Sequence, residues 1–321
     1  MSTCHNCGDA SGAVLFDAPA FDGVLAGQFP VSRCPRCGLA STGHATGETV
    51  AESYDIDYYG STESKFADWM ESLLDSLAAR RAGTLLKLWQ QGRQRQPSVL
   101  DIGCGRAVLL RAFRKLGAEV MGLERDEFPL QGELAEIVRH ASLDDEEFSD
   151  RQWDIIVLWH VFEHLEGQDA MLDRLCRHLT PGGILALAVP NFGSLQSRLF
   201  GRHWFHLDLP RHLVHIDAPW LRQRLQERGL KVEREGHLDL AQNLYGFVQS
   251  AMNALFPGRP NRFYALLKHG GRRGLRAWLE MCVWSLLAGL LMPFAVLESL
   301  YGLLTRSGAT VAFYARKEGE T

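Results

Sequence analysis

The stretch Val99-Leu100-Asp101-Ile102-Gly103-Cys104-Gly105 carries the strongest fold signal in this chain. An apolar run ends in an acid, two closely spaced glycines follow, and a helical pattern begins near Ala107. This order is typical of the first strand, turn and helix of an open α/β sheet. Glycines at such a turn let the backbone approach a ligand closely at the carboxyl edge of the sheet. The stretch therefore predicts a ligand-binding loop.

Strand-like and helix-like runs alternate after this loop. The expected strands are residues 98–102, 119–123, 153–159 and 183–189, and the expected helices are residues 107–116, 130–137 and 169–179. Two further strand-like runs, Lys231–Glu235 and Thr310–Ala315, enclose an insertion of about seventy residues that is helical by pattern. This alternation predicts an α/β fold with a doubly wound, Rossmann-like parallel sheet.

The first 37 residues carry four cysteines in two Cys-x-x-Cys pairs, Cys4 with Cys7 and Cys34 with Cys37. Two such pairs supply the tetrahedral set of four thiolates that structural zinc favours, and the paired spacing is a strong signal. Four unrelated buried or disulfide-bonded cysteines are the alternative interpretation. A redox dithiol would need a pair between a strand and a helix, which neither pair has. We therefore expect a small zinc ribbon at residues 1–45.

The residues around the glycine loop indicate which ligand it binds. A dinucleotide fingerprint would place a third glycine at Val108, and this chain has none there. The acid Asp101 suits a ligand with a cationic end and would repel a diphosphate. Glu124 ends the second expected strand, where a carboxylate can accept both hydroxyls of a ribose. A nucleoside with an amino-acid-like tail fits both acids, so we infer S-adenosylmethionine.

Several segments together resemble a class I S-adenosylmethionine-dependent methyltransferase. They are DIGCG at 101–105, Glu124, WDIIVLWHVFEHL at 153–165, LTPGG at 179–183 and VPN at 189–191. The resemblance covers residues from about 96 to 240, by these motifs. The whole arrangement is similar to bacterial small-molecule methyltransferases with an N-terminal zinc ribbon, a group that includes sugar C-methyltransferases. A nicotinamide-dependent oxidoreductase remains the alternative enzyme.

The resemblance implies roles for six residues at the cofactor site. Asp101, Gly103 and Gly105 would hold the methionine end, and Glu124 the ribose. Asp144, after the third strand, would lie near the adenine amino group. His160, after the fourth strand, would lie beneath the sulfonium.

Titratable side chains follow the fourth expected strand. His160, Glu163 and His164 share one face if a helix begins there directly. Glu163 and His164 are interpreted first as a hydrogen-bonded pair that fixes the loop, and His164 is also a catalytic candidate. Methyl transfer is an in-line displacement, so the protein must align a nucleophile and remove its proton where needed.

A second histidine cluster follows the fifth expected strand, at residues 203–215. Loops after strand ends build the site in this architecture, and histidines there can supply a base near neutral pH. His212 and His215 are the preferred candidates, with Arg211 placed to hold an anionic acceptor. A catalytic metal held by these histidines with Asp208 is left open and ranks below a metal-free base.

The insertion at residues 241–308 is apolar and basic. No charge occurs from Met281 to Leu297, a run near the lower limit for a membrane span. The strand expected at 310–315 must return to the same sheet, which a single crossing would forbid. A re-entrant hairpin, an interfacial helix, a homodimer contact or a lid remain open. Basic residues from Pro257 to Arg276 suit an anionic membrane surface or a phosphorylated substrate.

Composition sets the remaining expectations. The chain has 321 residues, is 46% apolar and carries a net charge of −4. The alternative function is a methyltransferase that uses the ribbon and the basic loop to bind nucleic acid. The nearly balanced charge argues against it. The three unpaired cysteines and the lack of a secretory start predict a cytoplasmic protein, with membrane association through the insertion left open.

We thus expect four regions and one activity. The regions are a zinc ribbon at 1–45, a linker and helix at 46–95, a cofactor domain at 96–240 plus 309–321, and the insertion at 241–308. The activity is methyl transfer from S-adenosylmethionine to a sugar, a sugar nucleotide or a lipid-linked metabolite. A degenerate fold that serves as a scaffold would bind no cofactor.

Overall fold

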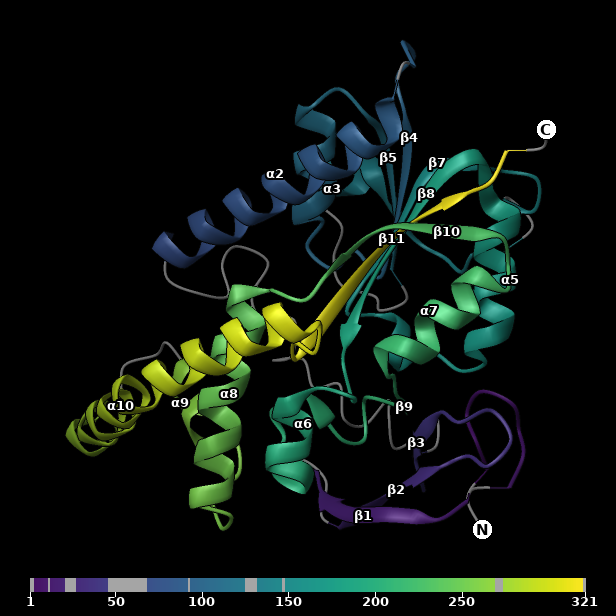
Figure 1. Ribbon diagram of the computed structural model, residues 1–321. Helices are drawn as coiled ribbons and strands as arrows, with labels where there is room; N and C mark the ends of the chain where they lie inside the picture. The colour runs from purple at the N-terminus through teal and green to yellow at the C-terminus, as the bar shows by residue number, and fades with distance from the viewer. Residues whose placement is uncertain are drawn as a thin grey trace.

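A computed structural model shows a seven-stranded sheet at the centre of the molecule (Figure 1). The structure describes residues 3–10, 12–20, 27–45, 68–91, 93–124, 132–145, 148–268 and 274–319. Much of the linker expected at 46–95 therefore lies outside the described residues. The strand order is β10-β11-β8-β7-β4-β5-β6. The strands are β4 Ser98–Ile102, β5 Glu119–Glu124, β6 Val138–His140, β7 Trp153–Trp159, β8 Leu179–Pro190, β10 Leu230–Gly236 and β11 Thr310–Lys317.

The doubly wound, Rossmann-like fold is confirmed, although the sheet is mixed rather than parallel throughout. β4, β5, β6, β7 and β8 pair in parallel, whereas β11 pairs antiparallel with both β8 and β10. The chain reaches β11 from the long insertion at the carboxyl edge, so β11 enters the sheet from that end. Thr310 accordingly pairs with Pro190, the last residue of β8. The expected strands at 231–235 and 310–315 are confirmed.

Helices cover both faces of the sheet, as a doubly wound fold requires. α2 and α3 pack on one face, whereas α5 and α7 pack on the other (Figure 1). The bounds are α2 Asp68–Gln90, α3 Val108–Lys115, α4 Glu133–Ile137, α5 Gln168–His178 and α7 Ala218–Gln226. Ile155 and Val157 of β7 face the α2 side, and Ile156 and Leu158 face the other. This alternation buries both faces of the central strand.

The N-terminal residues form a separate antiparallel sheet below the main one (Figure 1). Its strands are β1 Val14–Pro19, β2 Gln28–Arg33, β3 Ala40–Thr42 and β9 Val214–His215. The fourth strand, β9, comes from the segment that follows β8 and pairs with β3. The ribbon therefore shares a sheet with the histidine-rich segment at 203–215.

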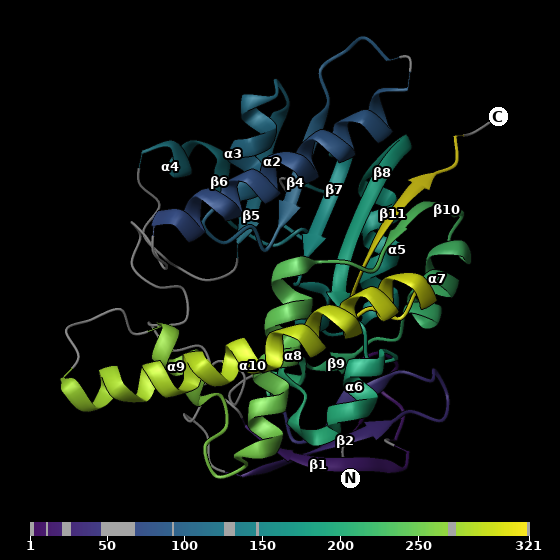
Figure 2. The same ribbon diagram turned by 60° about the vertical axis from the view of Figure 1, so that its left-hand side comes forward.

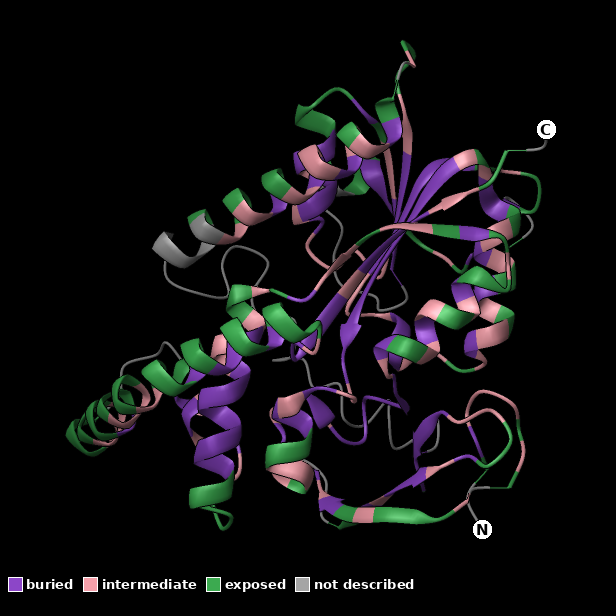
Figure 3. Ribbon diagram, viewed as in Figure 1, coloured by how far each residue is buried: buried purple, intermediate pink, exposed green. Residues whose placement is uncertain are grey.

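The insertion consists of helices α8 Leu240–Leu255, α9 Arg262–Lys268 and α10 Leu275–Thr305. α8 is buried along much of its length, whereas α10 crosses it and extends away from the sheets (Figures 2 and 3). Within the described residues, α10 is the one helix long and apolar enough to cross a membrane by length and composition. Only 11% of its most apolar window is buried.

Candidate active site

The glycine loop lies against the segment that follows β7. Gly103 has a φ of +69°, and a Cβ there would stand 2.5 Å from Cγ2 of Val161. Only glycine fits this position, because both the backbone conformation and the close contact exclude a side chain. The contact also places the loop after β4 beside the residues 160–164. The expected cofactor loop and the first group of titratable residues are therefore neighbours.

Two buried carboxylates flank this loop. Asp101 is 4% exposed and Glu124 is 7% exposed. The Gly105 N–H donates to Oε2 of Glu124 at 2.8 Å, so the second acid is fixed against the glycine turn. Burial raises the pKa of Asp101 to about 7, with Glu124 adding to the effect and Arg81 opposing it. A cationic ligand group beside Asp101 would offset the cost of burying this charge, which fits the amino end of S-adenosylmethionine.

The two remaining cofactor candidates differ in their surroundings. Asp144 lies beyond β6, is exposed, and pairs with Arg174. His160 directly follows β7 with a φ of 56°, and its side chain is 20% exposed. Among the described residues, Nε2 of His160 is buried without a hydrogen-bond partner. Such an atom is consistent with a ligand contact at this position.

The segment after β7 is not an α-helix. This corrects the expectation that His160, Glu163 and His164 share one face of a helix that begins directly after the strand. A 3-10 helix at Phe162–His164 follows the left-handed His160. Even so, Nδ1 of His160 lies 3.4 Å from Oε1 of Glu163. The tight turn therefore brings these side chains together by a different route from the one expected.

A cluster of Glu163, His164 and His212 lies at the same edge of the sheet. Glu163 is 2% exposed, and Nε2 of His212 lies 3.9 Å from its Oε1. The rings of His164 and His212 stand edge to face at 4.6 Å between centroids. Both histidines are candidates by sequence, but the sequence does not connect them, because nearly fifty positions separate them. The structure brings them together around one carboxylate.

Backbone carbonyls fix the orientation of both rings. Nδ1 of His164 donates to the Arg211 carbonyl at 3.0 Å, and Nδ1 of His212 donates to the His206 carbonyl at 2.9 Å. Nε2 of His212 is thereby turned toward Glu163. Imidazoles held in this way serve as proton acceptors or as metal ligands. One ligand atom from each member of the cluster lies within 4.8 Å of the others, so the set could also hold a metal ion.

Electrostatics distinguishes the members of this cluster. Burial raises the pKa of Glu163, but the hydrogen bond from the His160 ring and the electrostatic interaction with the His212 and His164 rings outweigh it and hold the pKa at about 2. Burial lowers the pKa of His212 to about 4, with His164 adding to the effect. At neutral pH the arrangement is an ionised carboxylate beside a neutral imidazole, whose lowered pKa keeps its Nε2 unprotonated and makes it a weaker base than a free imidazole.

His215 and Arg211 contact other side chains of the protein, His215 through Thr42 and Arg211 through Asp208. The hydroxyl of Thr42 donates to the His212 carbonyl at 2.6 Å and lies 3.0 Å from Nε2 of His215. His215 is 4% exposed, and burial lowers its pKa to about 3. Nε of Arg211 donates to Asp208 at 3.0 Å. Thr42 therefore ties the ribbon to the segment that carries the candidate base.

The four N-terminal cysteines are gathered as the spacing predicts. Their Sγ atoms all lie within 4.8 Å of one another, and the Sγ atoms of Cys4 and Cys37 are 3.6 Å apart, as are those of Cys7 and Cys34. None of the four is in a disulfide. Four thiolates at ~2.3 Å from one zinc ion would stand ~3.8 Å apart. The cluster therefore fits a closed structural zinc site.

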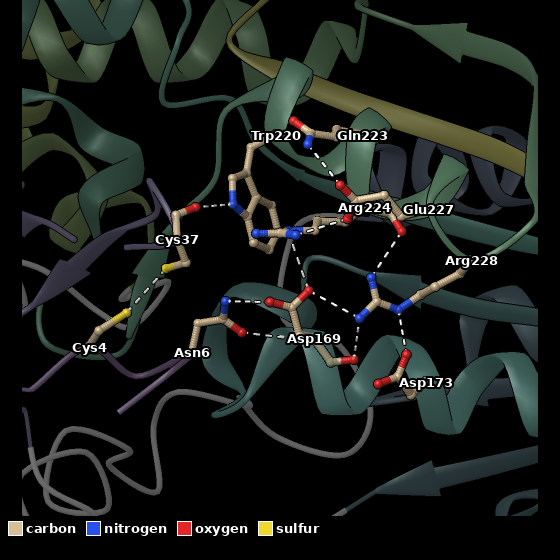
Figure 4. Close-up of polar contacts among 10 residues, drawn as sticks. All are labelled: Cys4, Asn6, Cys37, Asp169, Asp173, Trp220, Gln223, Arg224, Glu227 and Arg228. Carbon is tan, nitrogen blue, oxygen red and sulfur yellow. Dashed lines mark hydrogen bonds and ion pairs between the residues drawn. The ribbon is translucent and has the colours of Figure 1, made fainter. Parts of the chain in front are cut away.

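Polar contacts dock the ribbon onto the main domain (Figure 4). The indole N–H of Trp220 donates to the Cys37 carbonyl at 2.9 Å. Asn6 and Asp169 form two hydrogen bonds. The Asn6 side-chain amide donates to the Asp169 carboxylate at 2.8 Å, and the Asp169 backbone N–H donates to Oδ1 of Asn6 at 2.9 Å. Arg228 holds the same carboxylate at 3.1 Å. Both cysteine pairs are thus adjacent to residues that anchor α5 and α7.

Sequence analysis missed two residues that adjoin the site. The Arg81 guanidinium stacks over the Trp159 ring, 3.3 Å from its centroid, and also lies 3.5 Å from Asp239. Thr42 is the second missed residue. Nothing in the sequence near Arg81 or Thr42 marks a site, because their partners come from distant elements.

Comparisons with known proteins identify the family. Residues 66–235 match the family model described as "Methyltransferase domain". A ubiquinone biosynthesis O-methyltransferase of Rhodopseudomonas palustris (strain BisB5) is 30% identical over 157 residues, which are 44% of this chain and 60% of that protein. One of Bradyrhizobium sp. (strain ORS 278) is 32% identical over 126 residues, 35% of this chain and 48% of that protein.

A solved structure of a SAM-dependent methyltransferase from Archaeoglobus fulgidus is 17% identical, with a TM-score of 0.44, covering 76% of this chain and 94% of that one.

The chain belongs to the methyltransferase domain family, because the family model covers more than half of it. It contains a methyltransferase domain of the S-adenosylmethionine-dependent class, with a Rossmann-like sheet and an N-terminal four-cysteine cluster. The chain spans 60% or less of the length of the curated relatives described here. A methyl acceptor is implied by the activity, and its identity is a matter for proposal.

Proposed function

We propose that this protein transfers a methyl group from S-adenosylmethionine to a hydroxyl of a lipid-linked small molecule. The observation that carries this proposal is the Glu163, His164 and His212 cluster beside the glycine loop, because it supplies a proton acceptor next to the cofactor position. The curated relatives are described as O-methyltransferases of ubiquinone biosynthesis, which favours a hydroxyl acceptor. Sugars and sugar nucleotides are the competing acceptor classes.

The cofactor residues have separate tasks in this proposal. Asp101 binds the ammonium group, and Glu124 accepts the ribose hydroxyls, with Gly103 and Gly105 allowing close backbone approach. His160 lies beneath the sulfonium and Asp144 near the adenine. When bound, S-adenosylmethionine supplies a methyl group activated for displacement.

The acceptor residues orient and deprotonate the nucleophile. His212 or His164 takes the hydroxyl proton at Nε2, and the Glu163 carboxylate stabilises the imidazolium that forms. His215 acts through Thr42, as part of the support for this loop. A divalent cation held by the same three side chains is the alternative means of activating the hydroxyl.

The test is single-turnover methyl transfer with isotopically labelled S-adenosylmethionine. The acceptors are hydroxyl compounds on lipid chains of graded length, free sugars and sugar nucleotides. We expect His212→Ala to lower the rate by about a hundredfold, within the usual reach of general-base catalysis, with unchanged cofactor affinity. His203→Ala, in the same histidine-rich segment, is the matched control and should keep the rate.

Two outcomes would overturn parts of this proposal. Near-wild-type turnover in His212→Ala and in the double variant with His164→Ala would remove the base assignment. Transfer to sugars or sugar nucleotides in preference to lipid-linked acceptors would replace the acceptor class. Neither outcome touches the family assignment.

A further inference from the structure

α10 is exposed along much of its length (Figure 3), and many of its exposed side chains are large and apolar. More than half exposed on one face are Trp278 at 59%, Val283 at 67%, Leu286 at 69%, Leu290 at 63%, Leu297 at 63% and Leu304 at 84%. Successive residues are about 100° apart around a helix, so these positions fall on one side of α10. A continuous apolar face of this size on a protein surface marks an interaction site.

The opposite side of α10 is fixed to the protein from one end to the other. Near its start, Arg262 of α9 donates to Glu280 at 2.7 Å. Trp284 and Ala295 pack in the cluster shared with α8, and Gln196 donates to Glu298 at 3.1 Å. Because it is held along its length, α10 cannot cross a bilayer without unfolding the insertion. It can only lie along a surface.

The charges of the insertion select what kind of surface it meets. Residues 241–308 contain seven Lys and Arg but only two acids, a net of +5 in a chain whose net charge is −4. Both acids are engaged, Glu280 by Arg262 and Glu298 by Gln196. The exposed Arg276 lies at the start of α10, and the exposed Arg306 follows its end. The apolar face is therefore bounded by positive charge.

We propose that α10 is an interfacial helix that docks this protein on an anionic lipid bilayer. Its outward side chains would enter the boundary of the acyl chains, and the flanking arginines would contact lipid headgroups. A second copy of this chain fits the face less well. Antiparallel pairing of two α10 helices would bring Arg276 of one near Arg306 of the other, and parallel pairing would bring like ends together.

The position of α10 connects this surface to the site. The helix ends five residues before Thr310, the first residue of β11, which pairs with Pro190 at the carboxyl end of β8. The cofactor loop lies at the same edge of the sheet. Docking through α10 would therefore bring the acceptor side close to the bilayer. This step, from docking to a lipid-borne acceptor, rests on the proposed function, whereas the docking itself does not.

The experiment is co-sedimentation of the full chain with vesicles. We expect binding to vesicles with phosphatidylglycerol that is about tenfold stronger than binding to pure phosphatidylcholine, and that weakens with salt. Leu286→Glu with Leu290→Glu should reduce binding by about tenfold or more, because charge on the exposed apolar face opposes its insertion into the bilayer. Leu116→Glu, a 52% exposed leucine at the end of α3, is the matched control and should bind as wild type does.

Three results would overturn the proposal. They are no vesicle binding by the wild type, equal loss in the Leu116→Glu control, and a wild-type dimer that the α10 double variant converts to monomer. Cofactor titration of each variant separates this test from the proposed function, since failure to dock with intact S-adenosylmethionine binding overturns only the bilayer assignment. If the α10 double variant binds neither vesicles nor cofactor, it is misfolded, and Arg276→Glu is tested in its place. Arg276→Glu should lose only the preference for anionic lipid.

Discussion

The two halves of the candidate site are assembled in different ways. The cofactor half comes from consecutive units of the sheet, with Asp101 at the end of β4 and Glu124 at the end of β5. The acceptor half joins the 3-10 turn after β7, the histidine-rich segment before β9, and Thr42 of the ribbon. A local motif therefore builds one half, whereas long-range contacts build the other.

This difference bears on what each half can tolerate. The glycine loop is fixed by backbone geometry within one strand–turn–helix unit. The acceptor half depends on a second sheet, because β9 pairs with β3 and Thr42 holds the His212 carbonyl. Damage to the ribbon should therefore reach the acceptor side and leave the cofactor side intact.

The largest effect is expected at the cofactor half. Asp101→Ala should abolish measurable S-adenosylmethionine binding, because the buried carboxylate partners the cationic end of the ligand. Titration calorimetry measures the affinity, and circular dichroism checks that the variant is folded. Unchanged affinity in a folded variant, or tight binding of a nicotinamide dinucleotide by the wild type, would show that the two acids serve another ligand.

The sequence predicted that the candidate cofactor residues lie together, because the signals that place them are local. Asp101, the two glycines and Glu124 lie within two adjacent strand–turn units, so their spacing alone places them at one edge. The four cysteines were predictable for a similar reason, since each pair is a tight local turn. The strands at 231–235 and 310–315 were also found, although nothing in their patterns gave the antiparallel direction of β11.

The acceptor half was predicted residue by residue but not as a cluster. His164 and His212 were both candidates, yet their meeting at Glu163 depends on the path of the chain between them. The role of Thr42 depends on the pairing of β9 with β3 of the ribbon. A strand of two residues is too short to be predicted from the sequence pattern. The exposure of α10 was equally hidden, because an apolar run is the same whether a helix is buried or open to its surroundings.

An intermediate effect is expected from breaking the ribbon. Cys34→Ser should lose the zinc ion and loosen residues 3–45, since binding at such sites is coupled to folding. The buried Thr42 bonds would go with it. Each such bond is worth about 1–3 kcal/mol, so methyl transfer should fall by about tenfold or more. Elemental analysis measures the zinc, which should be about one equivalent in the wild type.

Cofactor affinity in Cys34→Ser should stay close to the wild-type value. Cys282→Ser, at an exposed cysteine outside the cluster, is the matched control and should keep the zinc. A Cys34→Ser protein with intact zinc would refute the ligand set. Lost cofactor binding in that variant would show that the two halves are not separable.

The smallest effect expected is a pH dependence confined to the cofactor half. Since burial raises the pKa of Asp101 to about 7, the free protein is mostly protonated there at pH 6 and mostly ionised at pH 8. The ligand ammonium needs the carboxylate, so S-adenosylmethionine affinity should be about tenfold lower at pH 6 than at pH 8, with proton release on binding at pH 6.

The same raised pKa of Asp101 destabilises the free protein progressively as pH rises from about 4 through 7, because the folded state holds a proton that the unfolded state gives up. Asp101→Asn should therefore bind the cofactor weakly at every pH, yet unfold at higher denaturant concentration than the wild type at pH 8. Affinity that is flat from pH 6 to pH 8 in the wild type would mean that Asp101 is already ionised in the free protein, and that its surroundings stabilise the charge before any ligand arrives.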